Sequence, residues 1–178
     1  TPGAIVRWGN VIHQEGGTVG NAAYGMYSVG TTVPIEVKPL GLMNYMEVNA
    51  GCGIVGDVFH AMYLDLLAYS EGQIKVHHYT YDIDTWEQLS DDNLGRDGLS
   101  LCAMETAQDR KTGKIYGVFW DESGTNLQWG TIDYTKMKRN FIGWAERQYV
   151  ALGISKEGTL YGISLDGNLY SISTTDGK

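Results

Sequence analysis

Ala151-Leu152-Gly153-Ile154 followed by Leu160-Tyr161-Gly162-Ile163 is the stretch that decides the fold, because its two-part pattern recurs along the chain. The pattern is a small residue within an apolar run, then an apolar–Tyr–Gly–apolar run. Two clear copies and one degenerate copy precede it: Arg7-Trp8-Gly9-Asn10 with Ala23-Tyr24-Gly25-Met26, Leu101-Cys102-Ala103-Met104 with Ile115-Tyr116-Gly117-Val118, and Gly51-Cys52-Gly53-Ile54 with Phe59-His60-Ala61-Met62. The small residues Gly9, Gly53, Ala103 and Gly153 are spaced by 44, 50 and 50 residues. A period of about 40–50 residues with several strands per repeat is typical of a β-propeller blade.

We therefore predict an all-β fold over 1–178, a partial β-propeller of about four blades with four antiparallel strands each. The approximate blades are 4–48, 50–90, 99–146 and 149–178. The strands predicted for the third blade are Ser100–Thr106, Lys114–Trp120, Leu127–Ile132 and Asn140–Ala145, and both faces of Lys114–Trp120 are largely apolar, as in a strand buried between blades. An antiparallel β-sandwich also consists of short, regularly spaced strands, but the repetition of equivalent motifs favours the propeller.

The second blade contains the least regular segment. Residues Ala61–Tyr69 place Met62, Leu66 and Tyr69 at the spacing of a helix face, but the segment is too short for an independent helix. We predict a strand or a loop excursion there, and a last strand at Thr85–Leu89 that follows a turn shaped by Asp82 and Asp84.

The fourth blade ends in the turn Thr174–Lys178 and lacks its outer strand. Proteins normally protect such an unpaired strand edge. We expect the edge to be covered by further blades of a longer chain, about seven or eight in all, or by a second copy related by two-fold symmetry.

Two successive phrases near the end of the chain carry a resemblance to a known class of repeats. Gly158-Thr159-Leu160-Tyr161-Gly162-Ile163 and Gly167-Asn168-Leu169-Tyr170-Ser171-Ile172 resemble the blades of secreted or surface-attached bacterial β-propeller proteins, many of which have no assigned function. The resemblance is clear over Leu101–Lys178 and faint over Thr1–Gln88. It implies an extracytoplasmic location, but the shared motifs are structural and bring no catalytic residues with them.

The overall charge excludes several partners. The chain of 178 residues has a formal net charge of −8 at pH 7, so its surface repels nucleic acid and anionic membranes. It contains no run of about 18 apolar residues, so no membrane insertion is predicted. Its 24 glycines and only 3 prolines suit many short strands joined by tight turns.

The two cysteines, Cys52 and Cys102, occupy the same slot of successive repeats. On neighbouring blades they would lie roughly 10 Å apart, beyond the roughly 7 Å between Cα atoms that a disulfide allows. We predict two buried, reduced thiols that act as small apolar residues. A disulfide and a catalytic or metal-binding role are the alternatives.

Histidines and acidic residues are the candidate metal ligands of this chain. His77 and His78 are adjacent in a predicted strand and therefore point to opposite faces, and His13 and His60 have no Cys, Asp or Glu at ligand-like spacing, so no metal site is predicted at the histidines. The oxygen-rich segment with Asp91, Asp92 and Asp97 is a candidate calcium site, although it lacks the spacing of an EF-hand loop, and the alternative is a solvated turn.

Exposed aromatic residues indicate where a ligand would bind. In a propeller, the connections between the second and third strands and those between blades share one rim. The candidate ligand-binding residues on this rim are Tyr45, Trp86, Arg96, Trp120, Trp144 and Arg147. Aromatic rings beside polar groups suit sugars or peptides, whereas packing between sheets is the alternative role for these rings.

Catalytic residues are harder to identify. Arg7 and Glu105 are the candidates for lining the central channel, and Glu105 is the only carboxylate on the predicted inner strands. Glycoside hydrolysis requires two facing acids. The hypothesis of a hydrolase or lyase therefore requires that residues outside this chain complete the active site.

We predict a non-enzymatic binding or scaffolding module of an extracytoplasmic bacterial protein, which recognises a glycan or a protein through the propeller rim and needs no cofactor. The alternatives are a propeller-type glycan hydrolase or lyase and a purely structural spacer.

Overall fold

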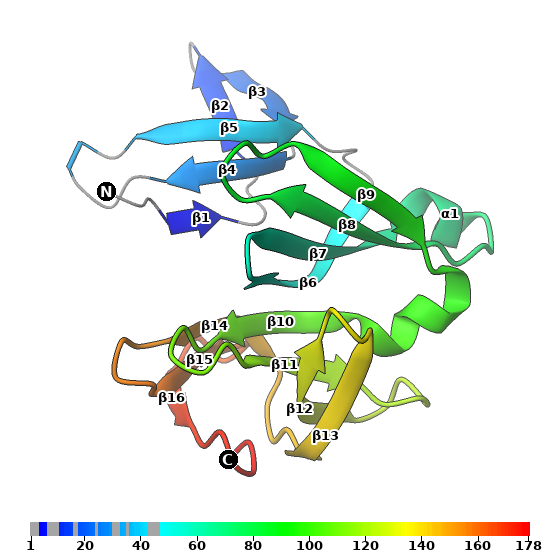
Figure 1. Ribbon diagram of the computed structural model, residues 1–178, viewed down its shortest axis with the longest axis vertical. Coiled ribbons are helices and arrows are strands. Elements are labelled where there is room, and N and C mark those ends of the chain that lie inside the picture. Colours follow the sequence, from blue (N-terminus) through cyan, green and yellow to red (C-terminus); the bar gives the residue numbers. More distant parts are fainter. Residues whose placement is uncertain are drawn as a thin grey trace. The chain divides into compact units, whose positions relative to one another are not determined.

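The computed structural model describes residues 4–6, 11–15, 18–23, 25–29, 33–34, 36–42 and 47–178 (Figure 1). The chain divides into two compact units, Thr1–Asn49 and Ala50–Lys178. Neither helix in the described part of the chain has the length and apolar character needed to cross a membrane.

The first unit contains a sheet and a hairpin. The sheet has the order β1 (Ala4–Val6), β4 (Gly25–Val29) and β5 (Val37–Leu42), all antiparallel, and β2 (Val11–Glu15) pairs with β3 (Thr18–Ala23). The stretch predicted as the first blade therefore holds a three-stranded sheet and a separate two-stranded hairpin.

The second unit confirms the all-β prediction, because three antiparallel sheets follow one another along the chain. In each sheet the strands lie side by side in sequence order. The first sheet consists of β6 (Glu47–Val55), β7 (Val58–Asp65), β8 (Val76–Asp82) and β9 (Gln88–Asn93); the second of β10 (Ala103–Gln108), β11 (Ile115–Trp120), β12 (Leu127–Asp133) and β13 (Lys138–Trp144); the third of β14 (Tyr149–Ile154), β15 (Leu160–Ser164) and β16 (Leu169–Ile172).

Two connections in the first sheet differ in detail from the prediction. The segment Ala61–Tyr69 is a strand as far as Asp65 and then a short helix, α1 (Leu66–Ser70), whose N-terminus is capped by Asp65 Oδ1 accepting from Ala68 N at 3.0 Å. The last strand begins at Gln88 rather than Thr85, because Asp82 Oδ1 accepts from the backbone N of Asp84 and of Thr85 at 2.9 and 2.8 Å and holds these residues in a turn.

The third predicted repeat begins differently from the expectation. Residues 95–101 form a 3-10 helix, η1 (Gly95–Leu101), so the predicted strand start at Ser100 is wrong and β10 begins at Ala103. The helix lies against β8, where a Cβ at Gly98 would come within 2.7 Å of Val76 Cβ.

The repeat alignment predicts equivalent positions for the two cysteines, and this prediction is wrong: Cys52 lies within β6, whereas Cys102 is the C-cap of η1. Gly117 of β11 pairs with Thr106, and the matching Gly162 of β15 pairs with Leu152. Thr106 therefore matches Leu152, whereas Cys102 precedes the strand at the end of η1. The similar sequences around Cys102 and Leu152 therefore occupy different positions in their sheets.

The core has two parts, one on each face of the second sheet. Ile115 and Phe119 of β11 join a cluster with residues of the first sheet, including Met62 and Val76. Tyr116 and Val118 of the same strand join a cluster with residues of the third sheet, which also contains the fully buried Trp129. These contacts confirm that both faces of β11 are buried, as its alternating sequence predicted.

Side chains of β10 form hydrogen bonds with backbone groups of β6 on the edge that does not pair with β7. Thr106 Oγ1 accepts from Cys52 N at 3.1 Å and donates to Cys52 O at 3.0 Å, while Gln108 Oε1 accepts from Ile54 N at 2.9 Å and Gln108 Nε2 donates to Ile54 O at 2.6 Å. Buried backbone groups need such partners. The first strands of two successive sheets thus lie side by side, joined through side chains instead of a backbone ladder.

Candidate functional site

The predicted rim residues fall at different ends of their sheets. Trp120, Trp144 and Arg147 lie at or just beyond the ends of β11 and β13, which is one end of the second sheet. Arg96 is exposed in η1, which follows β9, whereas Trp86 lies in the turn that precedes β9 and so at the opposite end of that strand. Trp86 therefore does not share the rim, and Tyr45 lies outside the described residues.

Trp86 has a packing role. Its backbone is in the left-handed region with φ of 61°, which is uncommon for a bulky residue. Its ring lies edge-on to Phe59 with 5.6 Å between ring centroids. The turn around Asp82 holds this conformation, since Trp86 N donates to Asp82 O at 2.9 Å.

Trp120 and Trp144 lie on opposite faces of the second sheet. Trp120 pairs with Leu127, which packs with the core cluster that faces the third sheet. Trp144 pairs with Gln128, which pairs with Phe119 on the face toward the first sheet. The two tryptophans share an end of the sheet but cannot stack on the same ligand face.

A bulge in β13 brings a second aromatic residue beside Trp144. The register shifts so that Trp129 pairs with Gly143 and Gly130 pairs with Phe141. Phe141 and Trp144 consequently point to the same face, with ring centroids 5.4 Å apart and an interplanar angle of 66°. Their side chains are 54% and 55% exposed. We refer to Phe141, Trp144, Gln128 and Arg139 as the aromatic platform.

Arg139 provides the charged group of the platform. Its guanidinium lies over the Phe119 ring at 5.1 Å from the centroid, and Nη1 donates to Trp120 O at 3.0 Å. Partial burial lowers the pKa of Arg139, while the nearby carboxylates of Glu122 and Asp121 act in the opposite direction. The guanidinium is thus fixed in place by an aromatic ring and a carbonyl rather than free in solvent.

Arg147 is engaged by the third sheet instead. Its guanidinium lies 4.3 Å from the centroid of the Tyr170 ring, and Nη1 donates to Glu146 Oε2 at 3.3 Å. The Tyr170 hydroxyl donates to Asp166 Oδ2 at 2.7 Å, and bonds from Ser164, the backbone of Asn168 and Tyr170 lower the pKa of Asp166. This arrangement orders the β15–β16 turn.

The channel-lining candidates do not form a catalytic pair in the described structure. Glu105 lies on β10, opposite Val118, and is half-buried. The neighbouring first strands are β6 (Glu47–Val55) and β14 (Tyr149–Ile154), and residues 48–55 and 149–154, whose side chains the structure describes, include no carboxylate. Arg7 lies outside the described residues. In the described part of these strands, no second acid therefore faces Glu105 as glycoside hydrolysis would need.

The acidic residues considered for calcium are dispersed. Asp91 and Asp92 are consecutive on β9 and point to opposite faces, and Asp97 lies in η1. Asp91 Oδ1 contacts His77 Nδ1 at 2.7 Å. In the part of the chain that the structure describes, no group of three or more His, Cys, Asp or Glu side chains is arranged to hold a metal ion.

His60 forms a buried pair that the sequence did not predict. His60 Nδ1 and His78 Nε2 share a hydrogen bond of 3.0 Å, and Tyr134 from the second sheet stacks on both rings at 5.7 and 6.1 Å between centroids. Burial, with a smaller contribution from His78, lowers the pKa of His60 to about 4. No local signal could reveal this pair, because it depends on the register between β7 and β8.

Both cysteines are free thiols, as predicted; Cys52 is buried, whereas Cys102 is only partly exposed to solvent rather than fully buried. Cys102 Sγ donates to Gly98 O at 3.5 Å, and burial raises the pKa of this thiol to about 12. A thiol with so high a pKa is a poor nucleophile at neutral pH. Cys52 is buried on β6 beside Thr106, where it packs as a small apolar residue.

Sequence reasoning named Trp144 but missed the other platform residues, Gln128, Arg139 and Phe141. Strict alternation over the strand would separate Phe141 from Trp144, and only the bulge places them on one face. The sequence has no significant match to any protein-family model or to any curated protein.

Proposed function

We propose that the chain is a non-enzymatic binding module that recognises a glycan through the aromatic platform. The observation that carries this proposal is the pair of half-exposed rings of Phe141 and Trp144 at 5.4 Å. Sugar C–H groups pack on aromatic faces, and Gln128 and Arg139 supply hydrogen-bond donors on the same face. Large exposed aromatic side chains side by side are otherwise disfavoured on a soluble surface.

The proposal includes the architecture that presents the platform: three consecutive blades of a β-propeller. Each of the first two sheets is a four-stranded antiparallel meander, and the first strands β6 and β10 lie side by side through Thr106 and Gln108. Packing of the second sheet between the other two is consistent with radially arranged blades. The repeat phrases over Leu101–Lys178 support a place in an extracytoplasmic bacterial protein, secreted or on the cell surface.

Affinity electrophoresis on a panel of neutral polysaccharides tests this function. Trp144→Ala and Phe141→Ala should each weaken retention by about tenfold, the effect of losing one ring contact. Tyr69→Ala is the matched control, because Tyr69 is 60% exposed in α1, away from the platform. Circular dichroism would verify that each variant is folded.

Three results would overturn the proposal. Retention that is equal in the wild type, Trp144→Ala and Tyr69→Ala would remove the platform from binding. Binding to an immobilised protein partner, lost in Trp144→Ala and without retention by any polysaccharide, would replace glycan recognition by protein recognition. Turnover of a polysaccharide that is abolished in Glu105→Gln would favour the hydrolase or lyase alternative.

A further inference from the structure

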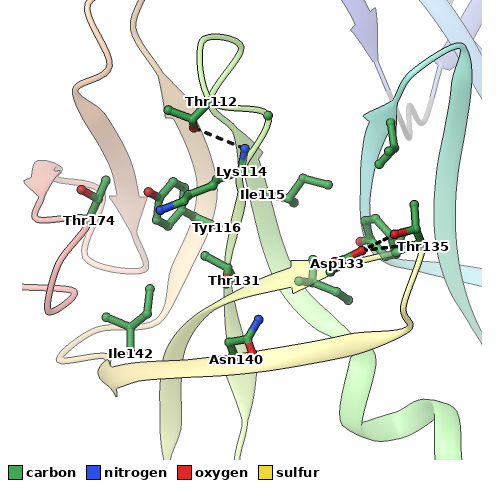
Figure 2. Close-up of a pocket in the computed structure, with 14 residues that line it drawn as sticks. Thr112, Lys114, Ile115, Tyr116, Thr131, Asp133, Thr135, Asn140, Ile142 and Thr174 are labelled. Carbon is green, nitrogen blue, oxygen red and sulfur yellow. Dashed lines mark hydrogen bonds between the residues drawn. The ribbon is translucent and has the colours of Figure 1, made fainter.

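A cavity of about 650 Å³ opens at the other end of the second sheet from Trp144. It is bordered by the β10–β11 turn, by the β12–β13 turn and by Thr174, which follows β16. Figure 2 shows the side chains of Tyr116, Thr131, Ile142 and Thr174 on one side of the β11–β12 hairpin and that of Ile115 on the other. Its size lies within the range of small-ligand sites, roughly 300–1,000 Å³.

The lining of this cavity is rich in uncharged hydrogen-bonding groups. Tyr116, Thr131 and Asn140 form one cross-strand row over β11, β12 and β13, so their side chains share a face. The Thr131 hydroxyl, the Asn140 carboxamide and the Thr174 hydroxyl form no hydrogen bond with any other residue that the structure describes. These groups are therefore available to the hydroxyls of a sugar.

Positive charge is concentrated at the same end of the sheet. The two turns, residues 109–114 and 133–138, contain five cationic residues and two acidic ones, in a chain whose formal net charge is −8. The cationic residues are Arg110, Lys111, Lys114, Lys136 and Lys138, all of them exposed. Because β10–β11 and β12–β13 turns lie at one end of an antiparallel sheet, these charges gather around the cavity.

Both acidic residues are already engaged inside their turns. Asp109 accepts from Lys111 N and Thr112 Oγ1, each at 2.8 Å, and these bonds lower its pKa. Asp133 accepts from Thr135 and pairs with Lys136 Nζ at 3.1 Å, which lowers its pKa to about 2. Lys114, which lines the cavity, makes no ion pair within the described residues.

We propose that this cavity binds an acidic glycan, a sugar whose carboxylate or sulfate group pairs with Lys114 while its hydroxyls bind Thr131, Asn140 and Thr174. The site is separate from the aromatic platform and does not depend on it. A sugar is favoured over nucleic acid because the cavity is lined by one lysine and several neutral hydroxyls, beside Asp133, whose carboxylate is held by Thr135 and Lys136. This lining suits a ligand with many hydroxyls and few charges better than a phosphate backbone. Arg110, Lys111 and Lys138 raise the local concentration of the anion.

Isothermal titration calorimetry with oligogalacturonate and with a neutral galactose oligomer of equal length tests the proposal. The uronate should bind more tightly than the neutral oligomer, and its affinity should fall as salt is added. Lys114→Ala should weaken uronate binding by about tenfold, and Lys114→Arg should retain it, because the lost interaction is a charge-assisted hydrogen bond. Asn140→Asp should weaken it as well, since the substitution places a negative charge beside the anion.

Matched controls keep the outcome unambiguous. Lys75→Ala removes the same charge near the start of β8 and should leave uronate affinity unchanged. Trp144→Ala should also leave it unchanged, so that this proposal and the platform proposal can fail separately. Lys114 is exposed in a turn, and circular dichroism would verify that its variants are folded.

Three results would overturn the proposal. The first is equal affinity for the charged and neutral oligomers, and the second is uronate binding that is insensitive to Lys114→Ala. The third is binding of an acidic peptide or of anionic phospholipid vesicles that Lys114→Ala abolishes, with no binding of uronate or of a sulfated oligosaccharide. That result would assign the basic turns to a different class of partner.

Discussion

Single glycines determine how closely the C-terminal turn packs on the second sheet. Gly177, with φ of +80°, lies against the Trp129 ring, where a Cβ would come within 2.6 Å of Cγ. A Cβ added at Gly143 of β13 would likewise come within 2.6 Å of the Asp176 carbonyl oxygen, which is too close for a non-bonded contact. Trp129 is fully buried and stacks on Tyr116 with 5.9 Å between centroids. The turn therefore closes one side of this aromatic stack.

Gly177→Ala should lower the free energy of unfolding by about 2–4 kcal/mol, because it combines a strained backbone with a steric clash. The control is Gly124→Ala, which has a similar φ of +68° but open space around its Cβ. We expect the control to lose only about 1 kcal/mol. Urea denaturation at pH 7 measures both, and equal losses would mean that the contact with Trp129 contributes nothing.

At the scale of elements, the interface between the first and second sheets contains a pH-sensitive contact. His60 and His78 lie on neighbouring strands, and Tyr134 stacks on them from the second sheet. Burial lowers the pKa of both histidines, and Asp92, which lies opposite His78, acts against this shift for His78. Protonation would place a charge inside the interface.

Stability should therefore fall as the pH drops from about 6.5 to about 4. The unfolded chain binds a proton at His60 near pH 6.5, whereas the folded chain does so only near its pKa of about 4. The contribution of the neutral His60 to the free energy of unfolding is fully present above pH 6.5. About 3 kcal/mol of this contribution is lost as the pH falls to about 4. Urea denaturation at pH 7, 5.5 and 4 would measure the loss.

His60→Phe is the matching variant, because a phenyl ring retains the stacking on Tyr134 but cannot titrate. Its stability should depend less on pH over the same range. The turn carboxylates, whose pKa values are lowered below 3.8, such as those of Asp82 and Asp109, lose their bonds only at lower pH. An identical pH dependence in wild type and variant would exclude His60 as the cause.

At the scale of the whole molecule, the third sheet of the second unit has one covered and one uncovered face. Along β15 the residues alternate strictly between buried and exposed. Ile163 on the exposed face pairs with Leu169, which is 66% exposed, and Tyr161 lies on the same face. Exposed apolar patches of this kind favour association.

We therefore expect the chain to self-associate in a concentration-dependent manner. Sedimentation equilibrium should give an average mass that rises with protein concentration. The double variant Ile163→Glu/Leu169→Glu should remain monomeric, because charge on the apolar face opposes its burial. The double variant Leu67→Glu/Tyr69→Glu adds the same charge on α1 and should behave as the wild type; equal effects of the two would show that net charge alone governs association.

Much of this architecture could be predicted from local sequence. Alternation over Ile115–Trp120 and the Asp166-Gly167 turn identified strands and hairpins, because both signals are contained within a few residues. The helix η1 and the bulge beside Phe141 could not, because they depend on how Gly98 packs on Val76 and on the register of β12 with β13. The cavity beside Lys114 was missed for the same reason, since its row of Tyr116, Thr131 and Asn140 is assembled across three strands.

The strand β11 belongs to both cores at once, with Ile115 and Phe119 on one side and Tyr116 and Val118 on the other. The second sheet thus has no hydrophobic interior of its own and is stable only between its neighbours. Coupling of this nearest-neighbour kind makes unfolding cooperative along a stack of repeats. A loss at either interface is transmitted through β11 to the other, so the three sheets should melt together as one thermodynamic unit.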